Sequence, residues 1–313
     1  MIKKAVIIPL IVGGSLILFG GIVAAISVAA AGGFAALSTA EPYVSRVIDA
    51  PADLNINVEE QNNQIVIITS ATATSVSITV QENNYETYTS TADGTDFTLV
   101  YQNNIPWMKH LFYIPLSLRT MTITVPASYV ASLDISNTNG VIDADDISLA
   151  GKLTLETANG VISVNKVTAT GNIDVRTTNS KIEVVDSTSA GNITAHSMNG
   201  YILLHGLNGA DITGQTTNGK IVAQEIVAQN LKVVTTNGGV VTSDIDVDVK
   251  IHLETTNGGI VGNVKGPSSD YDVDSRTTNG SNNLSGYNSQ TPTTDNKILY
   301  ARCYNGDISI TFK

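Results

Sequence analysis

Apolar and polar residues alternate along most of the chain beyond residue 42, and this period of two is the pattern of β-strands. A frame of about twenty residues is repeated along residues 131–313, and each copy is centred on an Asn. The frame asparagines are Asn139, Asn159, Asn179, Asn199, Asn218, Asn237, Asn257, Asn279 and Asn305. The next residue is Gly in every copy except one, where it is Ser180.

Two aliphatic columns and one hydroxyl column accompany each frame Asn. Six residues before it stand Leu133, Leu153, Ile173, Ile193, Ile212, Leu231, Ile251, Val273 and Leu299. Three residues after it stand Ile142, Ile162, Ile182, Ile202, Ile221, Val240, Ile260, Asn282 and Ile308, among which only Asn282 is polar. Two residues before it stand Thr157, Thr177, Ser197, Thr216, Thr235, Thr255 and Thr277.

This repeat predicts an all-β fold, a single-stranded β-solenoid of about nine coils stacked in chain order. Each coil would hold a strand, an Asn-Gly corner, a second strand and a return corner. We expect Asn and Gly to turn the chain at the corner because both residue types tolerate positive φ. Stacking would then bury the aliphatic columns and align the asparagines in a hydrogen-bonded ladder.

Residues 41–130 alternate in the same way but have no Asn-Gly frame, as in Leu54–Val58 and Met121–Val125. We interpret them as a β-cap or irregular first coils, because an open solenoid end exposes unpaired strand edges. The segment Ile105–Pro115 holds the only Trp, Trp107. It either packs in the cap or contacts the membrane interface or a partner, where Trp and Tyr are favoured.

The N-terminal residues 1–40 form a third segment. From Ala5 to Ala40 the chain carries no charge for 36 residues, which is enough for one membrane-spanning helix. Lys3 and Lys4 precede this run, so the positive-inside tendency predicts a single-pass signal anchor that exports residues 41–313. The alternative is a signal peptide cleaved after Leu37–Ala40.

Composition and charge narrow the function. Only 14% of residues are charged, while the chain has 28 Asn and 26 Gly. Residues 41–313 hold 15 basic and 28 acidic residues, a net charge of −13, which argues against nucleic-acid binding. The lone Cys303 excludes a disulfide framework within the chain and a cysteine-rich metal site.

Candidate catalytic residues are few. The column three residues before each Asn is predicted to face outward and reads Ser136, Glu156, Arg176, His196, Gln215, Val234, Glu254, Arg276 and Arg302. Glu156 beside Arg176 and Glu254 beside Arg276 are expected to be exposed ion pairs. The histidines, His110, His196, His205 and His252, share no column. We therefore predict no catalytic residue, no metal site and no cofactor.

Two further patterns leave alternatives open. Asp244, Asp246 and Asp248 alternate along one strand and Asp270, Asp272 and Asp274 along another, so two adjacent rows would either hold calcium or form a solvated face. The column before each Asn reads Thr138, Ala158, Thr178, Met198, Thr217, Thr236, Thr256, Thr278 and Tyr304. It would either contact ice or a glycan, or reflect the preference of strands for Thr.

The apolar N-terminal segment, the segment Thr120–Pro126 and serial copies such as LDISNTNGVIDA and LTLETANGVISV are shared with a known bacterial family. In these features the chain resembles the LiaG-like "putative adhesins", a domain family of unknown function with a repetitive β-solenoid. It implies an envelope-exposed, non-catalytic protein, an adhesin or an accessory of the envelope stress response with a glycan or protein partner. The alternative is a surface β-helix protein that binds or degrades polysaccharide.

Overall fold

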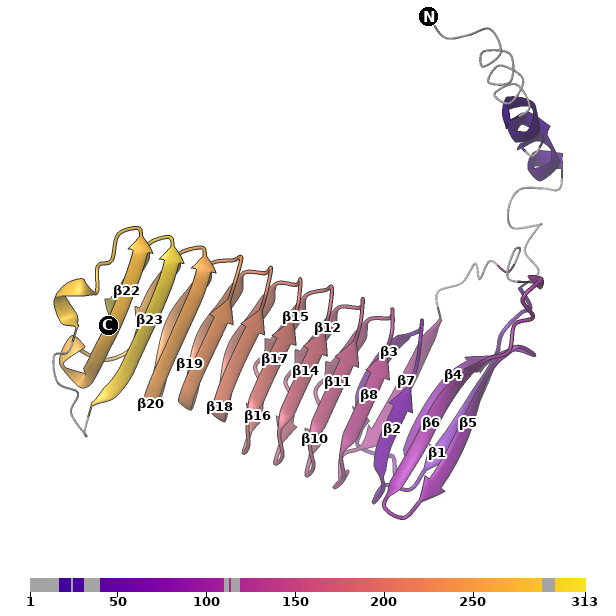
Figure 1. Cartoon of the computed structure of the whole chain (residues 1–313). Coiled ribbons are helices and arrows are strands. Elements are labelled where there is room, and N and C mark those ends of the chain that lie inside the picture. The colour runs from indigo at the N-terminus through magenta and orange to yellow at the C-terminus, as the bar shows by residue number, and fades with distance from the viewer. Residues whose placement is uncertain (1–16, 24, 31–39, 110–112, 114–118, 289–295) are drawn as a thin grey trace, which may run out of the picture.

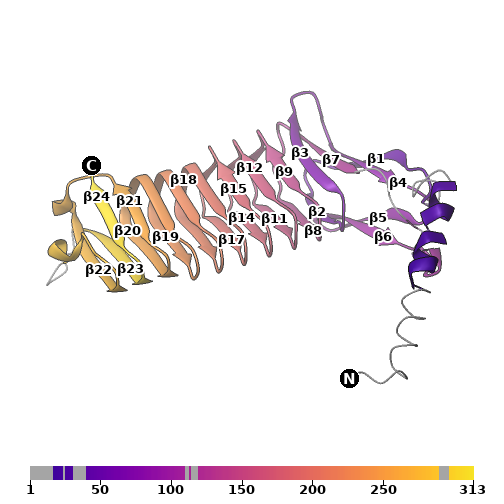
Figure 2. The same ribbon diagram turned by 90° about the horizontal axis from the view of Figure 1, so that it is seen from above.

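The computed structural model describes residues 17–23, 25–30, 40–109, 113, 119–288 and 296–313. The all-β class is confirmed, because nearly all described residues beyond 40 belong to strands or to the turns that join them. The strands stack in two main rows along a rod, as Figures 1 and 2 show from two directions, and a third row of short strands runs along the return corner. One continuous set of buried apolar side chains fills the space between the rows.

The strands fall into three groups along the rod. The cap strands are β1 (Val44–Ala50), β2 (Asn55–Glu59), β3 (Gln64–Ser70), β4 (Val76–Glu82), β5 (Glu86–Asp93), β6 (Asp96–Asn103) and β7 (Thr120–Pro126). The first regular coils hold β8 (Leu133–Asn137), β9 (Ile142–Asp145), β10 (Ser148–Leu149), β11 (Leu153–Thr157), β12 (Ile162–Asn165), β13 (Thr168–Ala169), β14 (Ile173–Thr177), β15 (Ile182–Val185), β16 (Thr188–Ser189) and β17 (Ile193–Ser197).

In the second half of the rod the strands run round the return corner without a break. They are β18 (Ile202–Thr216), β19 (Ile221–Thr235) and β20 (Val240–Asn257). The far end holds β21 (Ile260–Val264), β22 (Tyr271–Asn279), β23 (Lys297–Asn305) and β24 (Ile308–Phe312), with the short helices η2 (Ser268–Asp270) and η3 (Ser285–Tyr287).

Neighbouring coils pair in parallel and in the predicted register. Leu153 of β11 lies between Leu133 of β8 and Ile173 of β14, and Ile162 of β12 lies between its equivalents in β9 and β15. Every aliphatic residue of the two predicted columns is buried, with an exposed fraction of 2% or less. The predicted core columns are therefore confirmed.

Two ladders of hydrogen bonds run along the Asn-Gly corner. In each coil the frame Asn donates its Nδ2 to the Oδ1 of the Asn in the adjacent coil, at 2.7–2.8 Å along the whole stack. Beneath it, the buried hydroxyl two residues before the Asn donates to a carbonyl of the adjacent coil, for example Thr235 Oγ1 to Gly219 O at 2.8 Å. Cys303 takes the same position and places its Sγ 2.9 Å from Gly258 O.

The glycine of the corner is required for a different reason from the one predicted. Gly160 and Gly200 do not have positive φ, but a Cβ on them would lie 1.8 Å from Gly140 O and 1.6 Å from Ser180 O. The prediction of a left-handed Asn-Gly turn is wrong for these coils, because the close approach of adjacent backbones is what excludes a side chain. The left-handed residues other than Gly belong to the return corner and are Asp146, Lys166, Asp186, Glu225 and Asp244, with φ between 46° and 54°.

The coils at the far end are not stacked in chain order. Strand β23 lies between β20 and β22, so Asn305 is bonded to both Asn257 and Asn279. The predicted sequential order is therefore wrong at this end. Every coil presents the same row of donors and acceptors, so the frame fixes the register of a coil but not its place in the stack.

The near end has the same kind of inversion. Strands β2 and β3 pair directly with β8 and β9, and the later strands β6 and β7 lie outside them. Asn62, in the corner between β2 and β3, is a tenth member of the ladder and accepts the amide of Asn139 at 2.8 Å. Antiparallel strands then close this end, with β5 on β6, β4 on β7 and β1 on β4.

Two side-chain amides cover the outermost strands of the far end. Asn288 accepts the backbone N–H of Ser275 in β22 at 2.8 Å and donates to the carbonyl of the same residue at 3.1 Å. Asn283 does the same for Ile310 in β24, at 3.0 and 2.8 Å. Each amide occupies hydrogen-bonding positions that a further strand would use, which opposes pairing between rods.

The N-terminal segment is described in part. Residues 17–23 and 25–30 are helical, and Figure 1 shows them beyond the cap end of the rod. Within the described residues, the helical stretches are too short to count as membrane spans. Most of the predicted anchor, residues 1–16, 24 and 31–39, lies outside the described residues.

Candidate binding surfaces

The outward column before the corner is arranged partly as predicted. Glu156 lies directly opposite Arg176, as expected for adjacent coils. Glu254 lies opposite Arg302, and Arg302 opposite Arg276. The predicted pairing of Glu254 with Arg276 is therefore wrong, because β23 separates their strands.

The described histidines stay apart. His196 lies in β17, His205 in β18 and His252 in β20, and only His252 has an acidic partner, Glu254, at 2.9 Å. His110 lies outside the described residues.

The two aspartate rows do not face each other. Asp244 bonds Lys313 at 3.0 Å, and hydrogen bonds from Ser243 and Lys313 hold the pKa of Asp244 below its usual range. Asp274 forms a bidentate pair with Arg302 at 2.7 Å, across the strand boundary that the insertion of β23 creates.

The predicted calcium site required the two aspartate rows to be adjacent. This adjacency is wrong because β23 lies between β20 and β22. Nowhere in the described part of the chain do three or more His, Cys, Asp or Glu side chains come close enough together to hold a metal ion.

The column of small residues beside the Asn ladder forms an exposed, narrow strip. Most of its members are solvent-exposed threonines such as Thr178 and Thr217. Met198 and Tyr304 interrupt the strip, with exposed fractions of 51% and 57%. The backbone positions of the strip are continuous, but its side chains are not all Thr, so it offers no uniform Thr surface.

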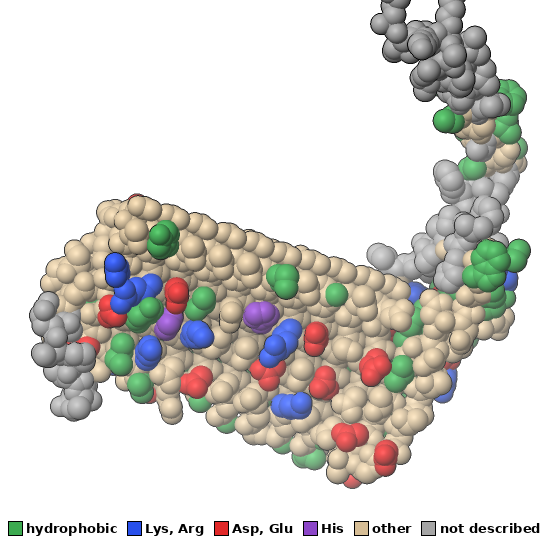
Figure 3. All heavy atoms as spheres, in the orientation of Figure 1, with side chains coloured by type: hydrophobic (Ala, Val, Ile, Leu, Met, Phe, Trp, Pro, Cys, Tyr) green, Lys and Arg blue, Asp and Glu red, His purple; other side chains and the backbone are tan. Residues whose placement is uncertain are grey.

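Cations and aromatic rings gather on the outward face of the last coils. We call this group the terminal patch, which consists of Lys232, Lys250, His252, Arg276, Tyr300, Arg302 and Tyr304. Strand register brings them together, because Lys232 lies opposite His252 and His252 opposite Tyr300. Figure 3 shows Lys and Arg side chains concentrated at this end of the visible face.

Tyr300 is the centre of the terminal patch. Its ring lies 4.4 Å from the His252 ring, 5.0 Å from the Arg302 guanidinium and 5.9 Å from Lys250 Nζ. Such contacts hold cations over an aromatic face. Two shallow hollows flank the ring, one lined by Lys232, Lys250 and His252 and the other by Arg276, Arg302 and Tyr304.

The terminal patch has an excess of positive charge within an acidic chain. Glu254 is paired with His252, and Asp274 with Arg302. In the described residues no carboxylate lies within 4.0 Å of the side-chain nitrogens of Lys232, Lys250 or Arg276. These free cations and the exposed Tyr304 ring can contact anionic groups and sugar rings in solution.

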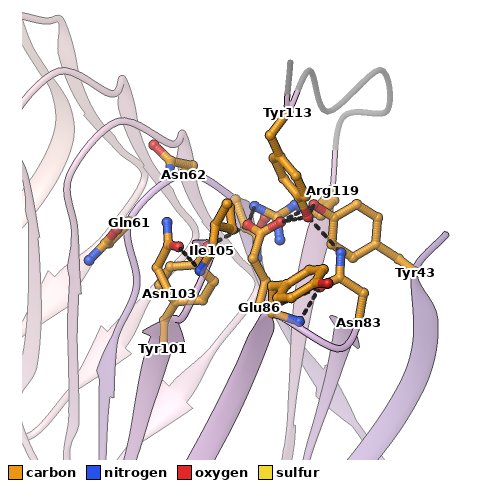
Figure 4. Close-up of polar contacts among 12 residues, drawn as sticks. Tyr43, Gln61, Asn62, Asn83, Glu86, Tyr101, Asn103, Ile105, Tyr113 and Arg119 are labelled. Atoms are coloured by element: carbon orange, nitrogen blue, oxygen red, sulfur yellow. Dashed lines mark hydrogen bonds and ion pairs between the residues drawn. The ribbon is translucent and has the colours of Figure 1, made fainter. Parts of the chain in front are cut away.

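A second group of polar side chains is buried in the cap. The Glu86 carboxylate accepts hydrogen bonds from the hydroxyls of Tyr43, Tyr101 and Tyr113 and pairs with Arg119 at 2.9 Å. We call these five residues the cap cluster, and Figure 4 shows the three tyrosines converging on Glu86. Glu86 and Arg119 are only 3% and 7% exposed.

The electrostatics of the cap cluster indicate a structural role. Burial raises the pKa of Glu86, but the three tyrosine hydroxyls and Arg119 outweigh burial and hold this pKa below its usual range. Burial and the bond to Glu86 raise the pKa of Tyr43 and of Tyr101 far above the usual value. Glu86 is therefore a carboxylate with its acceptors filled, and neither a general acid nor a free ligand.

Sequence reasoning missed the cap cluster because its members lie far apart in the chain. Tyr43 precedes β1, Glu86 begins β5, and Arg119 directly precedes β7. The only sequence signal was weak. Tyrosines are concentrated before residue 130, in a region that is also poor in the Asn-Gly frame.

A rod of in-register parallel coils, with ladders at its corners and no metal-binding cluster in its described residues, defines a class of repetitive β scaffold. The sequence profile of one such family, described as "Toastrack DUF4097", matches residues 53–311. The chain belongs to this family. The matched range includes both the cap strands β2–β7 and the coils of the rod.

Solved structures that the chain matches have very different sequences. A "putative adhesin" from Parabacteroides distasonis is 12% identical, with a TM-score of 0.51 over 88% of this chain and 98% of its own. A "putative cell adhesion protein" from Clostridium sporogenes is 12% identical, with a TM-score of 0.31 over 87% and 100% of the two chains. No curated protein matches the chain. The likeness to the Parabacteroides structure, at 12% identity, shows the fold alone.

Proposed function

We propose that the chain is a membrane-anchored, extracytoplasmic and non-catalytic binding protein, an adhesin or an interaction module of the cell envelope. In this proposal residues 1–40 are the single-pass anchor, residues 41–130 form the cap, and residues 131–313 form the rod. The cap follows the apolar segment directly, so the rod would carry its far end away from the membrane.

The observation that carries the proposal is the position of the terminal patch. It lies at the end of the rod opposite the cap, in a chain whose net charge is −11. Lys232, Lys250 and Arg276 have no carboxylate partner among the described residues, and Tyr300 is held in place by the contacts around it. These features suit recognition of an acidic polymer or protein surface.

Polysaccharide binding is the more specific form of this proposal. Tyr304 is 57% exposed beside one hollow, and Tyr300 lines the same hollow. Aromatic rings beside charged and hydroxyl groups are the usual means of holding a sugar ring and its acidic substituents. Degradation of the polymer is not part of the proposal, because glycoside hydrolysis requires two carboxylates facing one bond.

The test measures binding of the full chain, reconstituted in vesicles, to an array of acidic and neutral envelope polysaccharides. Wild type is expected to retain an acidic polymer, and the double variant Tyr300→Ala/Tyr304→Ala to bind it about tenfold more weakly, a loss of about 1.4 kcal/mol. Val261→Ala is the control, since Val261 is 49% exposed on the other row of strands. Equal binding by all three proteins would remove the terminal patch from the proposal.

A further inference from the structure

The most exposed large apolar side chain of the described residues beyond 40 is the only Trp of the chain. Trp107 is 78% exposed, and Met108 beside it is 65% exposed. Both lie in a tight turn after β6 that is closed by the bond from Lys109 N to Pro106 O at 2.8 Å. A soluble surface gains nothing from presenting two large apolar side chains side by side.

This turn is attached to the first residue after the uncharged run. Lys109 Nζ lies 3.9 Å from the carboxylate of Glu41, and Lys109 also bonds Tyr85 and lies 4.3 Å above its ring. Asn83 donates to the Glu41 carbonyl at 3.4 Å. Trp107 is only two residues from Lys109, so it is within about 7 Å of backbone reach from that contact.

The cap cluster also holds together the two segments on either side of this contact, the one after Glu41 and the one after Lys109. Tyr43, two residues after Glu41, and Tyr113, four residues after Lys109, both donate to Glu86, and their hydroxyls are 3.3 Å apart. Asn83 donates to Tyr113 at 2.7 Å. The start of the exported chain and the segment that carries Trp107 are thus held by one buried carboxylate.

We propose that Trp107 and Met108 are a second membrane contact, which inserts into the lipid interface beside the point where the apolar segment 5–40 ends. The inference rests on the proposed anchor. Trp favours the headgroup region, and the ion pair between Lys109 and Glu41 keeps the turn beside the end of the apolar segment. Two contacts joined by the cap cluster would limit the tilt of the rod on the membrane.

The test uses the native fluorescence of the full chain, because Trp107 is its sole source of tryptophan emission. The chain is reconstituted in phosphatidylcholine vesicles, with or without brominated acyl chains, and its association is verified by flotation. We expect blue-shifted emission, several-fold lower quenching by acrylamide than in the free amino acid, and strong quenching by the brominated lipid.

A matched reporter separates lipid contact from a general vesicle effect. The variant Trp107→Phe/Tyr304→Trp moves the only Trp to the far end, where emission should be red-shifted and insensitive to bromine. In a second variant that keeps Trp107, the substitution Met108→Asp should restore quenching of Trp107 by acrylamide without affecting flotation. Vesicle-bound chain whose Trp107 is quenched as freely as the far-end reporter would overturn the second contact, whereas chain that does not float would overturn the anchor itself.

Discussion

The cap and the rod bury polar groups in opposite ways. In the regular coils of the rod, residues 133–260, the buried polar side chains are the neutral Asn, Ser and Thr, and the rod buries an acidic residue, Asp272, only in its terminal coils. The cap buries Glu60, Glu86 and Arg119. A repeat places like upon like in adjacent coils, so a charge in a buried column would repel its own copy at about 4.8 Å. The cap occurs once and can surround a charge with unlike partners.

The two regions are therefore expected to be sensitive to different changes, the rod to added side-chain volume and the cap to protonation. The rod depends on backbones that approach closely at every Asn-Gly corner, so it is sensitive to added volume. The cap depends on an ionised carboxylate with four donors, so it is sensitive to protonation. Changes in either region therefore test the distinction directly.

The largest effect is expected from Gly200→Ala in the rod. A Cβ there would lie 1.6 Å from Ser180 O, and only separation of two coils could relieve the clash. We expect a loss of at least about 3 kcal/mol in the free energy of unfolding, measured by denaturant titration. Gly239→Ala is the control, because its nearest contact would be 3.4 Å, and equal losses in both variants would refute the close-approach explanation.

A smaller effect is expected from Glu86→Gln in the cap. Gln keeps the size but leaves the Arg119 guanidinium without its anion, a loss of about 2 kcal/mol. Glu82→Gln is the control, since Glu82 pairs with the half-exposed Arg46, and it should change stability by less than about 0.5 kcal/mol.

Wild type and Glu86→Gln together also test how the stability of the cap depends on pH. The folded-state pKa of Glu86 is below its unfolded value of about 4.3, so its contribution is complete above that value and is lost as pH falls through the folded pKa. Wild type should therefore begin to lose its excess stability over Glu86→Gln as pH falls below about 4.3, and should have lost it once pH is below the folded pKa. A constant difference over this range would mean that Glu86 is not ionised in the folded cap.

The smallest effect is expected from Asn199→Ala on the exposed ladder. The variant removes one amide bond to Asn179 and one from Asn218, both at 2.7 Å. Exposed neutral bonds of this kind contribute little, so the loss should be about 1 kcal/mol in thermal unfolding. The exposed neighbour Thr217→Ala should shift the same transition less, and a larger shift for Thr217→Ala would show that the ladder amides do not stabilise the rod.

The core of the rod was predictable because its signal is local and repeated. An aliphatic at each of two fixed distances from Asn identified the buried columns, including Leu153 and Ile162. The same frame fits Asn62, with Ile56 six residues before and Ile65 three after, but Asn63 stands where Gly was expected. The tenth ladder position was missed for that reason.

Other features depend on contacts that no local pattern encodes. The left-handed return corner is occupied by residues such as Lys166 and Glu225, whose types do not indicate positive φ. The cap cluster joins Tyr43, Glu86 and Arg119 across three separate segments. The terminal patch forms only because β23 enters between β20 and β22, and nothing in the frame indicates that order.

The inverted order at both ends has an evolutionary consequence. The near end is completed by β6 and β7, which lie outside β2 and β3. The far end is completed by β23, which lies between β20 and β22. Both closures must be kept intact, so gene duplication or deletion can act only on whole units between them. A change of one unit would lengthen or shorten the rod by about 4.8 Å and leave both ends unaltered. The reach of such a protein can thus be adjusted in fixed steps without redesign of its base or its tip.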